Sequence, residues 1–143
     1  MTTQQRRALE GLYVLLVEDS GVTALNTLRV LQERGGAIVE ICTSIGTAKE
    51  RIEAARFDLV ILDYGLGGGE RGVHLAHSLM HHEREKIRQI VRISYSGAEP
   101  EIILRDVPAD DAKTIFATML TKPVPLRELI DILQATAELH GKI

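Results

Sequence analysis

Short apolar runs alternate along the chain with longer segments that have helical spacing. Five of these runs are suited to strands, at residues 12–17, 37–42, 59–62, 90–93 and 115–120. Strands that alternate with helices are typical of βαβ units, which build a parallel sheet. The pattern therefore predicts an α/β fold.

The composition of each run indicates where its strand lies in the sheet. Runs 12–17 and 59–62 are apolar without a break, as expected for central strands that helices cover on both faces. Residues 39–43 instead alternate between apolar and polar side chains, which indicates a half-exposed strand. We therefore expect that strand at an edge.

Helical spacing is clearest near the C-terminus. Leu126, Leu129, Ile130 and Leu133 follow the i, i+3, i+4, i+7 pattern of one buried face, and Pro125 before them suits a helix start. Similar patterns predict helices over residues 22–31, 48–55 and 73–80, and two prolines bracket a short helix over 101–107.

Composition and charge narrow the possible functions. Of the 143 residues, 45% are apolar and 26% are charged, which is typical of a globular domain. The 17 basic and 20 acidic residues leave a formal net charge of −3, whereas proteins that bind nucleic acid normally carry a basic excess. No apolar run approaches the ~20 residues of a membrane span. We therefore expect no nucleic-acid partner and no membrane insertion.

Cys42 is the single cysteine, so the chain cannot form an internal disulfide or a cysteine-built zinc site. This composition suits a reducing cytoplasm. Residues 1–10 are interpreted as a polar leader and residues 11–143 as one domain.

Polar residues follow four of the predicted strands. Ligands of a doubly wound sheet bind beyond the carboxyl ends of its strands. The residues at these ends are Glu18 and Asp19, Asp63, Ser96 and Lys122. Carboxylates suit a hard cation such as Mg²⁺, and a lone lysine supplies a compact charge for an anion.

This order of residues, an acidic pair, Asp, Ser-Gly and Lys-Pro, resembles the receiver domain of bacterial response regulators from Leu12 to about His140. The resemblance implies a flavodoxin-like (βα)5 fold with the five-stranded parallel sheet in the order 2-1-3-4-5. It also implies a cis peptide bond between Lys122 and Pro123.

The same resemblance implies a role for each polar residue. Asp63 is expected to accept a phosphoryl group from a phosphohistidine. Mg²⁺ is expected at Glu18, Asp19, Asp63 and the Gly65 carbonyl, while Ser96, the Gly97 amide and Lys122 are expected to bind the phosphoryl group or pair with the modified aspartate. The donor would be a sensor histidine kinase or a histidine phosphotransfer protein, and an effector protein would read the change by docking. We expect a regulatory domain without an attached output domain, and not an enzyme.

Three features depart from the family pattern. Gly67 stands where the family usually has proline, and Met119 stands where it has a switch aromatic. The interval from Ser96 to Lys122 is a few residues long for the family. The region of the fourth helix is therefore the least transferable.

Two other functions stay open. Residues 67–72 match the pattern G-x-G-x-x-G of dinucleotide-binding enzymes, although the motif should occupy the first strand-to-helix turn. A receiver-like scaffold that is not phosphorylated is the other alternative. His77 and His81 could chelate a metal because they share one helix face, but we expect that face to meet solvent and assign no metal to it.

Overall fold

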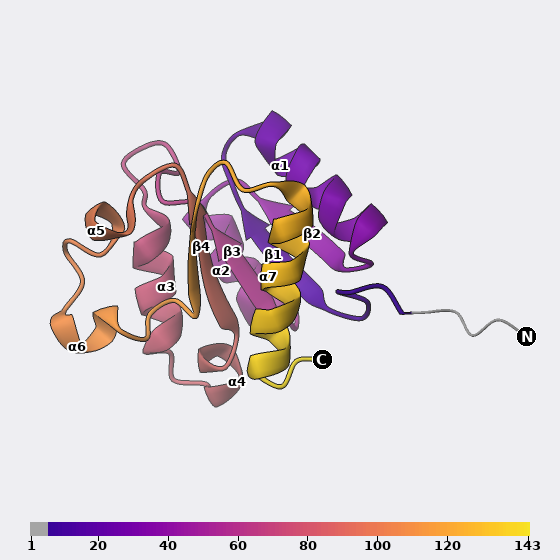
Figure 1. The fold of residues 1–143 in the computed structure, drawn as a ribbon. Helices are drawn as coiled ribbons and strands as arrows, with labels where there is room; N and C mark the ends of the chain where they lie inside the picture. Colours follow the sequence, from indigo (N-terminus) through magenta and orange to yellow (C-terminus); the bar gives the residue numbers. More distant parts are fainter. Residues whose placement is uncertain (1–5) are drawn as a thin grey trace, which may run out of the picture.

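Figure 1 shows a computed structural model of the protein, which describes residues 6–143. The strands are β1 (Tyr13–Val17), β2 (Ile38–Cys42), β3 (Leu59–Leu62), β4 (Val91–Ser96) and β5 (Thr118–Thr121). They form one parallel sheet in the order β2-β1-β3-β4-β5. The predicted flavodoxin-like α/β fold and strand order are confirmed, with β1 and β3 inside the sheet and β2 at an edge.

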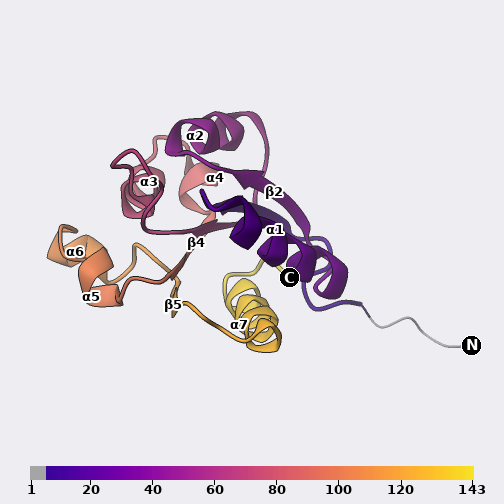
Figure 2. The same ribbon diagram turned by 90° about the horizontal axis from the view of Figure 1, so that it is seen from above.

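Helices cover both faces of the sheet (Figure 2). One face carries α1 (Gly21–Arg29) and α7 (Leu126–Leu139), and the other carries α2 (Ile45–Ala54) and α3 (Gly72–Met80). Alternate residues of β1 point to opposite faces, so Leu15 packs in the core beneath α2 and α3, while Leu16 packs beneath α1 and α7. Both faces of the central strands are therefore buried.

The predicted first helix has two parts. A π-helical segment, η1 (Val30–Arg34), continues α1, and Gly35 and Gly36 end it. Leu31 is fully buried in this segment. The helix thus keeps its apolar contact with the sheet although its hydrogen-bond pattern widens.

The region between β3 and β5 departs most from the sequence-based prediction. A short helix, α4 (Glu85–Arg88), precedes β4 and was not predicted. The single helix predicted over 101–107 is wrong: the structure has α5 (Pro100–Ile103) and α6 (Ala109–Ala112). α5 ends at Ile103, before Pro108 is reached, and Pro108 is the residue that directly precedes α6.

The start of β5 also lies later than predicted. Ile115 and Phe116 are buried but precede the strand, which begins at Thr118. The two side chains pack into the core beneath α2 and α3. Ile115 and Phe116 are therefore apolar because they hold the chain against the core before β5, and not because they belong to the strand.

Part of the polar leader predicted over residues 1–10 contacts the domain. Residues 1–5 lie outside the described part of the chain. Leu9 is fully buried, and its amide donates to the Gly35 carbonyl at 2.7 Å. Among residues 6–143, no helix is long and apolar enough to cross a membrane.

Candidate functional site

Two neighbouring strands deliver carboxylates to the same end of the sheet. Val17, the last residue of β1, lies in register with Leu62, the last residue of β3. The next residues, Glu18 and Asp63, therefore emerge side by side. The Asp63 amide donates to the Val17 carbonyl at 3.1 Å, which extends the strand ladder up to this aspartate.

Glu18, Asp19 and Asp63 form one acidic cluster. Each offers a carboxylate oxygen, and these oxygens lie within 4.8 Å of one another. Glu18 is 4% exposed, so its charge is largely removed from water. Oxygen donors at this spacing fit a hard divalent cation such as Mg²⁺, which binds one or two carboxylates and keeps several waters.

Lys122 enters the cluster from the far side of β4. Its Nζ atom lies 2.8 Å from Glu18 Oε2 and 3.6 Å from Asp63 Oδ2. The Lys122 amide donates to the Ser96 carbonyl at 2.8 Å, which fixes the backbone where β5 ends. The peptide bond to Pro123 is cis, as predicted.

The surroundings shift the proton affinity of both members of this ion pair. Burial raises the pKa of Glu18 above its ordinary value, and the charge of Asp63 raises it further against the opposing effect of Lys122. Burial alone would lower the pKa of Lys122, but the hydrogen bond that it donates to Glu18 and the charge of Asp63 raise it overall. The lysine therefore stays charged, and its single ammonium group faces a cluster of three carboxyl groups.

The remaining predicted site residues lie nearby without joining the ion pair. Ser96 is buried at the end of β4, and its Oγ accepts a hydrogen bond from the Ala98 amide at 3.2 Å. Gly65 is exposed and pairs with Arg71 across the loop between β3 and α3. Within residues 6–143, no direct hydrogen bond joins either residue to Asp63.

The glycine-rich segment 67–72 forms a closed turn. Gly67, Gly68 and Gly69 all have positive φ angles, a backbone conformation that favours glycine. The Glu70 amide donates to the Gly67 carbonyl at 3.0 Å and closes the turn. The loop follows the third strand, whereas the dinucleotide fingerprint belongs to the first strand-to-helix turn. Its position and closure give no support to a dinucleotide site.

Gly72 has a positioning role that the sequence did not indicate. A Cβ atom at this residue would lie 2.0 Å from the Asp63 carbonyl oxygen. The Gly72 amide also donates to the Tyr64 carbonyl at 2.9 Å. The first turn of α3 therefore packs against the backbone of Asp63, and only glycine fits.

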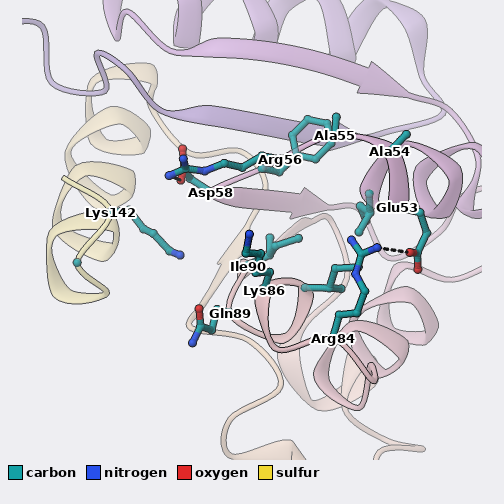
Figure 3. A pocket seen from close by; sticks show the side chains of 14 residues that line it. Glu53, Ala54, Ala55, Arg56, Asp58, Arg84, Lys86, Gln89, Ile90 and Lys142 are labelled. Atoms are coloured by element: carbon teal, nitrogen blue, oxygen red, sulfur yellow. Dashed lines mark ion pairs between the residues drawn. The ribbon is translucent and has the colours of Figure 1, made fainter.

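A pocket of about 510 Å³ lies at the other end of the sheet (Figure 3). It is lined by residues that precede β3 and β4 and by Lys142, which points toward it in Figure 3. Arg84 and Arg56 in its wall lie near acidic partners, at 3.4 Å from Glu53 and 3.6 Å from Asp58. This pocket is separate from the acidic cluster, which lies at the carboxyl ends of the strands.

Comparison with known proteins identifies the class. Residues 14–134 match the response regulator receiver domain, and the chain belongs to this family. No curated protein matches the chain in sequence.

Solved structures share the fold at low sequence identity. A response regulator receiver domain protein from Methanospirillum hungatei JF-1 is 21% identical with a TM-score of 0.76, covering 91% of this chain and 96% of its own. A receiver domain from Methylobacillus flagellatus is 23% identical with a TM-score of 0.70, covering 87% and 98%. A sensor protein from Polaromonas sp. JS666 is 21% identical with a TM-score of 0.75, covering 91% and 98%.

Family membership places the chain in two-component signalling. Receiver domains of this kind are typically regulatory and partner with histidine kinases.

Proposed function

We propose that Asp63 accepts a phosphoryl group in a Mg²⁺-dependent reaction and that a docking protein reads the change. The observation that carries this proposal is the position of Lys122, whose Nζ atom lies 3.6 Å from Asp63 Oδ2 inside an acidic cluster. Phosphoryl transfer depends mainly on positioning and on neutralising charge. The three carboxylates offer a place for a metal cation, and the Lys122 ammonium group already lies among them.

The donor is a phosphohistidine of a sensor histidine kinase or of a histidine phosphotransfer protein. An oxygen of the Asp63 carboxylate attacks the phosphorus, and the P–N bond of the donor breaks. The histidine ring leaves with the bonding electrons and takes up a proton. The product is an acyl phosphate on Asp63.

Each neighbour of Asp63 has a distinct part in this proposal. Asp19, Asp63 and the Gly65 carbonyl would hold Mg²⁺ beside Glu18, and the bound ion would neutralise charge on the phosphoryl oxygens. Lys122 pairs with the modified aspartate. Its Nζ atom is hydrogen-bonded to Glu18 Oε2 at 2.8 Å and already lies 3.6 Å from Asp63 Oδ2. The Ser96 hydroxyl and Gly97 amide complete the contacts to the phosphoryl oxygens.

Phosphoramidate tests this reaction without a partner protein because it carries the same kind of P–N bond. With Mg²⁺ present, we expect the chain to gain the mass of one phosphoryl group. Asp63→Asn should gain none, while Asp106→Asn, at an exposed aspartate between α5 and α6, should behave as wild type. Equal labelling of the Asp63→Asn variant would contradict the assignment.

The effector is proposed to dock on the surface formed by α5, β5 and α7. Ile103 of α5 is buried, but its neighbour Ile102 is 46% exposed, and Leu126 at the start of α7 is 45% exposed. Met119 lies in β5, where it packs partly buried against the core. An unbranched thioether adapts to its surroundings, so this surface should shift only modestly on phosphorylation. Beryllofluoride should therefore move amide resonances of β5 and α5, and shifts confined to the strand-end loops would contradict this docking surface.

A further inference from the structure

Two histidines and an aspartate form a second group of metal-ligating side chains. His77 and His81 lie one turn apart at the C-terminal end of α3, so they share one face of the helix. The Nε2 atom of each lies 3.0 Å from Oδ2 of Asp111. The three ligand atoms lie within 4.8 Å of one another.

The aspartate reaches the histidines because the chain between β4 and β5 folds back toward α3. Asp111 belongs to α6, which lies beside α3 in both views (Figures 1 and 2). Its carbonyl accepts the Ile115 amide at 2.8 Å, and Ile115 is fully buried. The core thus holds the Asp111 backbone in place opposite the two rings.

We propose that His77, His81 and Asp111 bind a divalent late first-row transition metal ion of the Zn²⁺ class. Imidazole nitrogen with one carboxylate oxygen suits Zn²⁺, Ni²⁺ or Cu²⁺, whereas Mg²⁺ prefers oxygen ligands alone. Three protein ligands leave a further coordination position for water. The site is thus chemically distinct from the all-carboxylate cluster at Glu18, Asp19 and Asp63.

The two distances from nitrogen to oxygen are close to those of a coordination shell. Zn–N and Zn–O bonds of about 2.0–2.1 Å place neighbouring ligand atoms of a tetrahedron roughly 3.3 Å apart. The two N–O separations of 3.0 Å need to open by only a few tenths of an ångström. The side chains are 44%, 53% and 18% exposed for His77, His81 and Asp111, so an ion can enter from solvent.

The environment of Asp111 also suits a cation. The hydrogen bond from His81 holds the pKa of Asp111 below its ordinary value, and the hydrogen bond from His77 acts in the same direction.

Binding would join α6 to α3 through one ion. Residues 97–117 otherwise contain only two four-residue helices, α5 and α6. The ion would therefore brace the part of the chain that precedes β5.

Calorimetric titration of the whole chain with Zn²⁺, in buffer containing excess Mg²⁺ to occupy the acidic cluster, tests the proposal. We expect one equivalent of Zn²⁺ to bind to the wild type. His77→Ala and Asp111→Asn should each weaken binding at least tenfold. His74→Ala is the matched control, since His74 lies exposed on the same helix outside the cluster, and it should bind as wild type. Circular dichroism confirms that each variant is folded.

A second readout distinguishes coordination from loose surface binding. Co²⁺ in place of Zn²⁺ should give visible absorption bands in the wild type and in His74→Ala, and these bands should disappear in the His77→Ala/His81→Ala double variant. If the wild type binds no Zn²⁺, or if the double variant binds it with unchanged affinity, the three residues form a hydrogen-bonded contact only and the metal site is wrong.

Discussion

All four residues of β3 are buried, whereas all four residues of β5 are partly exposed. Asp63 follows β3 directly and is held by the strand ladder. Ser96 and Lys122 instead bracket the segment 97–121, in which two short helices and irregular turns lead into β5. Asp63 thus follows a strand that is buried throughout. Lys122 follows a strand that is only partly buried and that we expect to be less rigid.

This difference indicates which part of the site can move. An acceptor needs a fixed position relative to a metal ion, because phosphoryl transfer depends on alignment. To transmit a signal, part of the fold must be able to move. Segments with fewer buried contacts unfold locally at a lower free-energy cost. We therefore expect the response to Asp63 chemistry to travel through Lys122 and β5.

The largest expected effect compares the two strands directly. Leu62→Ala in β3 removes a side chain that is 1% exposed and should lower the free energy of unfolding by ~2–5 kcal/mol. Met119→Ala in β5 should cost less because Met119 is only partly buried. Urea unfolding measures both. Equal losses would show that β5 is packed as firmly as β3.

A smaller loss is expected from Gly72→Ala. The new methyl group would meet the Asp63 carbonyl oxygen, and overpacking of this kind costs about 1–3 kcal/mol. Because the backbone of Asp63 must shift, the affinity for Mg²⁺ should fall as well. Gly97→Ala is the control in the looser segment, since nothing lies within 4 Å of its Cβ position. Unfolding and Mg²⁺ titration should leave that variant close to wild type, and an unchanged Mg²⁺ affinity in Gly72→Ala would contradict its positioning role.

The raised pKa of Glu18 makes the free energy of unfolding depend on pH, and the sign of this dependence is fixed. Burial and the charge of Asp63 raise the pKa of Glu18, so the folded protein binds this proton more tightly than the unfolded chain does. The resulting stability is present below the ordinary pKa of 4.5 and is lost as the pH rises through the folded-state pKa. The contribution of the charged Lys122, whose pKa is also raised, is kept up to alkaline pH.

Paired unfolding measurements isolate the effect of Glu18. From mildly acidic to neutral pH, without Mg²⁺, wild type should lose stability relative to Glu18→Gln, because the glutamine cannot ionise. A constant difference between the two proteins over this range would show that Glu18 is not strained by burial.

The smallest expected change concerns the lifetime of the phosphoryl group. Gly65, two residues after Asp63, is exposed, and nothing lies within 4 Å of its Cβ position. Tyr64, which could otherwise shield the site, packs against the core, and its hydroxyl contacts Arg71. Water should therefore reach the acyl phosphate, and Gly65→Arg should slow its hydrolysis several-fold. Unchanged decay of the phosphorylated mass would show that another group controls water access.

The same contrast explains what the sequence could predict. The unbroken apolar run of β3 and the polar residue at its end are local features, so the strand, its central place and Asp63 all follow from pattern. The Lys122–Glu18 bond joins residues 104 positions apart, and its partner choice depends on side-chain reach across β4. The sequence pattern could place Glu18 and Lys122 at the same end of the sheet, but it could not predict the hydrogen bond between them.

The looser segment was harder to predict for a physical reason. Apolar residues at 102–104 and 115–116 suggested a helix and a strand, yet Ile103, Ile115 and Phe116 serve as separate anchors into the core. Single buried residues of this kind do not recur at a regular spacing along the chain, so a pattern of apolar positions cannot identify them. For the same reason, the contact of Asp111 with His77 and His81 gave no sequence signal. The histidine face does meet solvent, as expected, since the two side chains are 44% and 53% exposed, but it also contacts Asp111.

Intact-mass measurement after treatment with a small phosphodonor tests the central claim most directly. Wild type should gain one phosphoryl group with Mg²⁺ and almost none with a chelator, and Asp63→Asn should gain none under either condition. A phosphoryl adduct that forms equally well without Mg²⁺, or that persists in Asp63→Asn, would contradict the account of Asp63 as a metal-dependent phosphoacceptor.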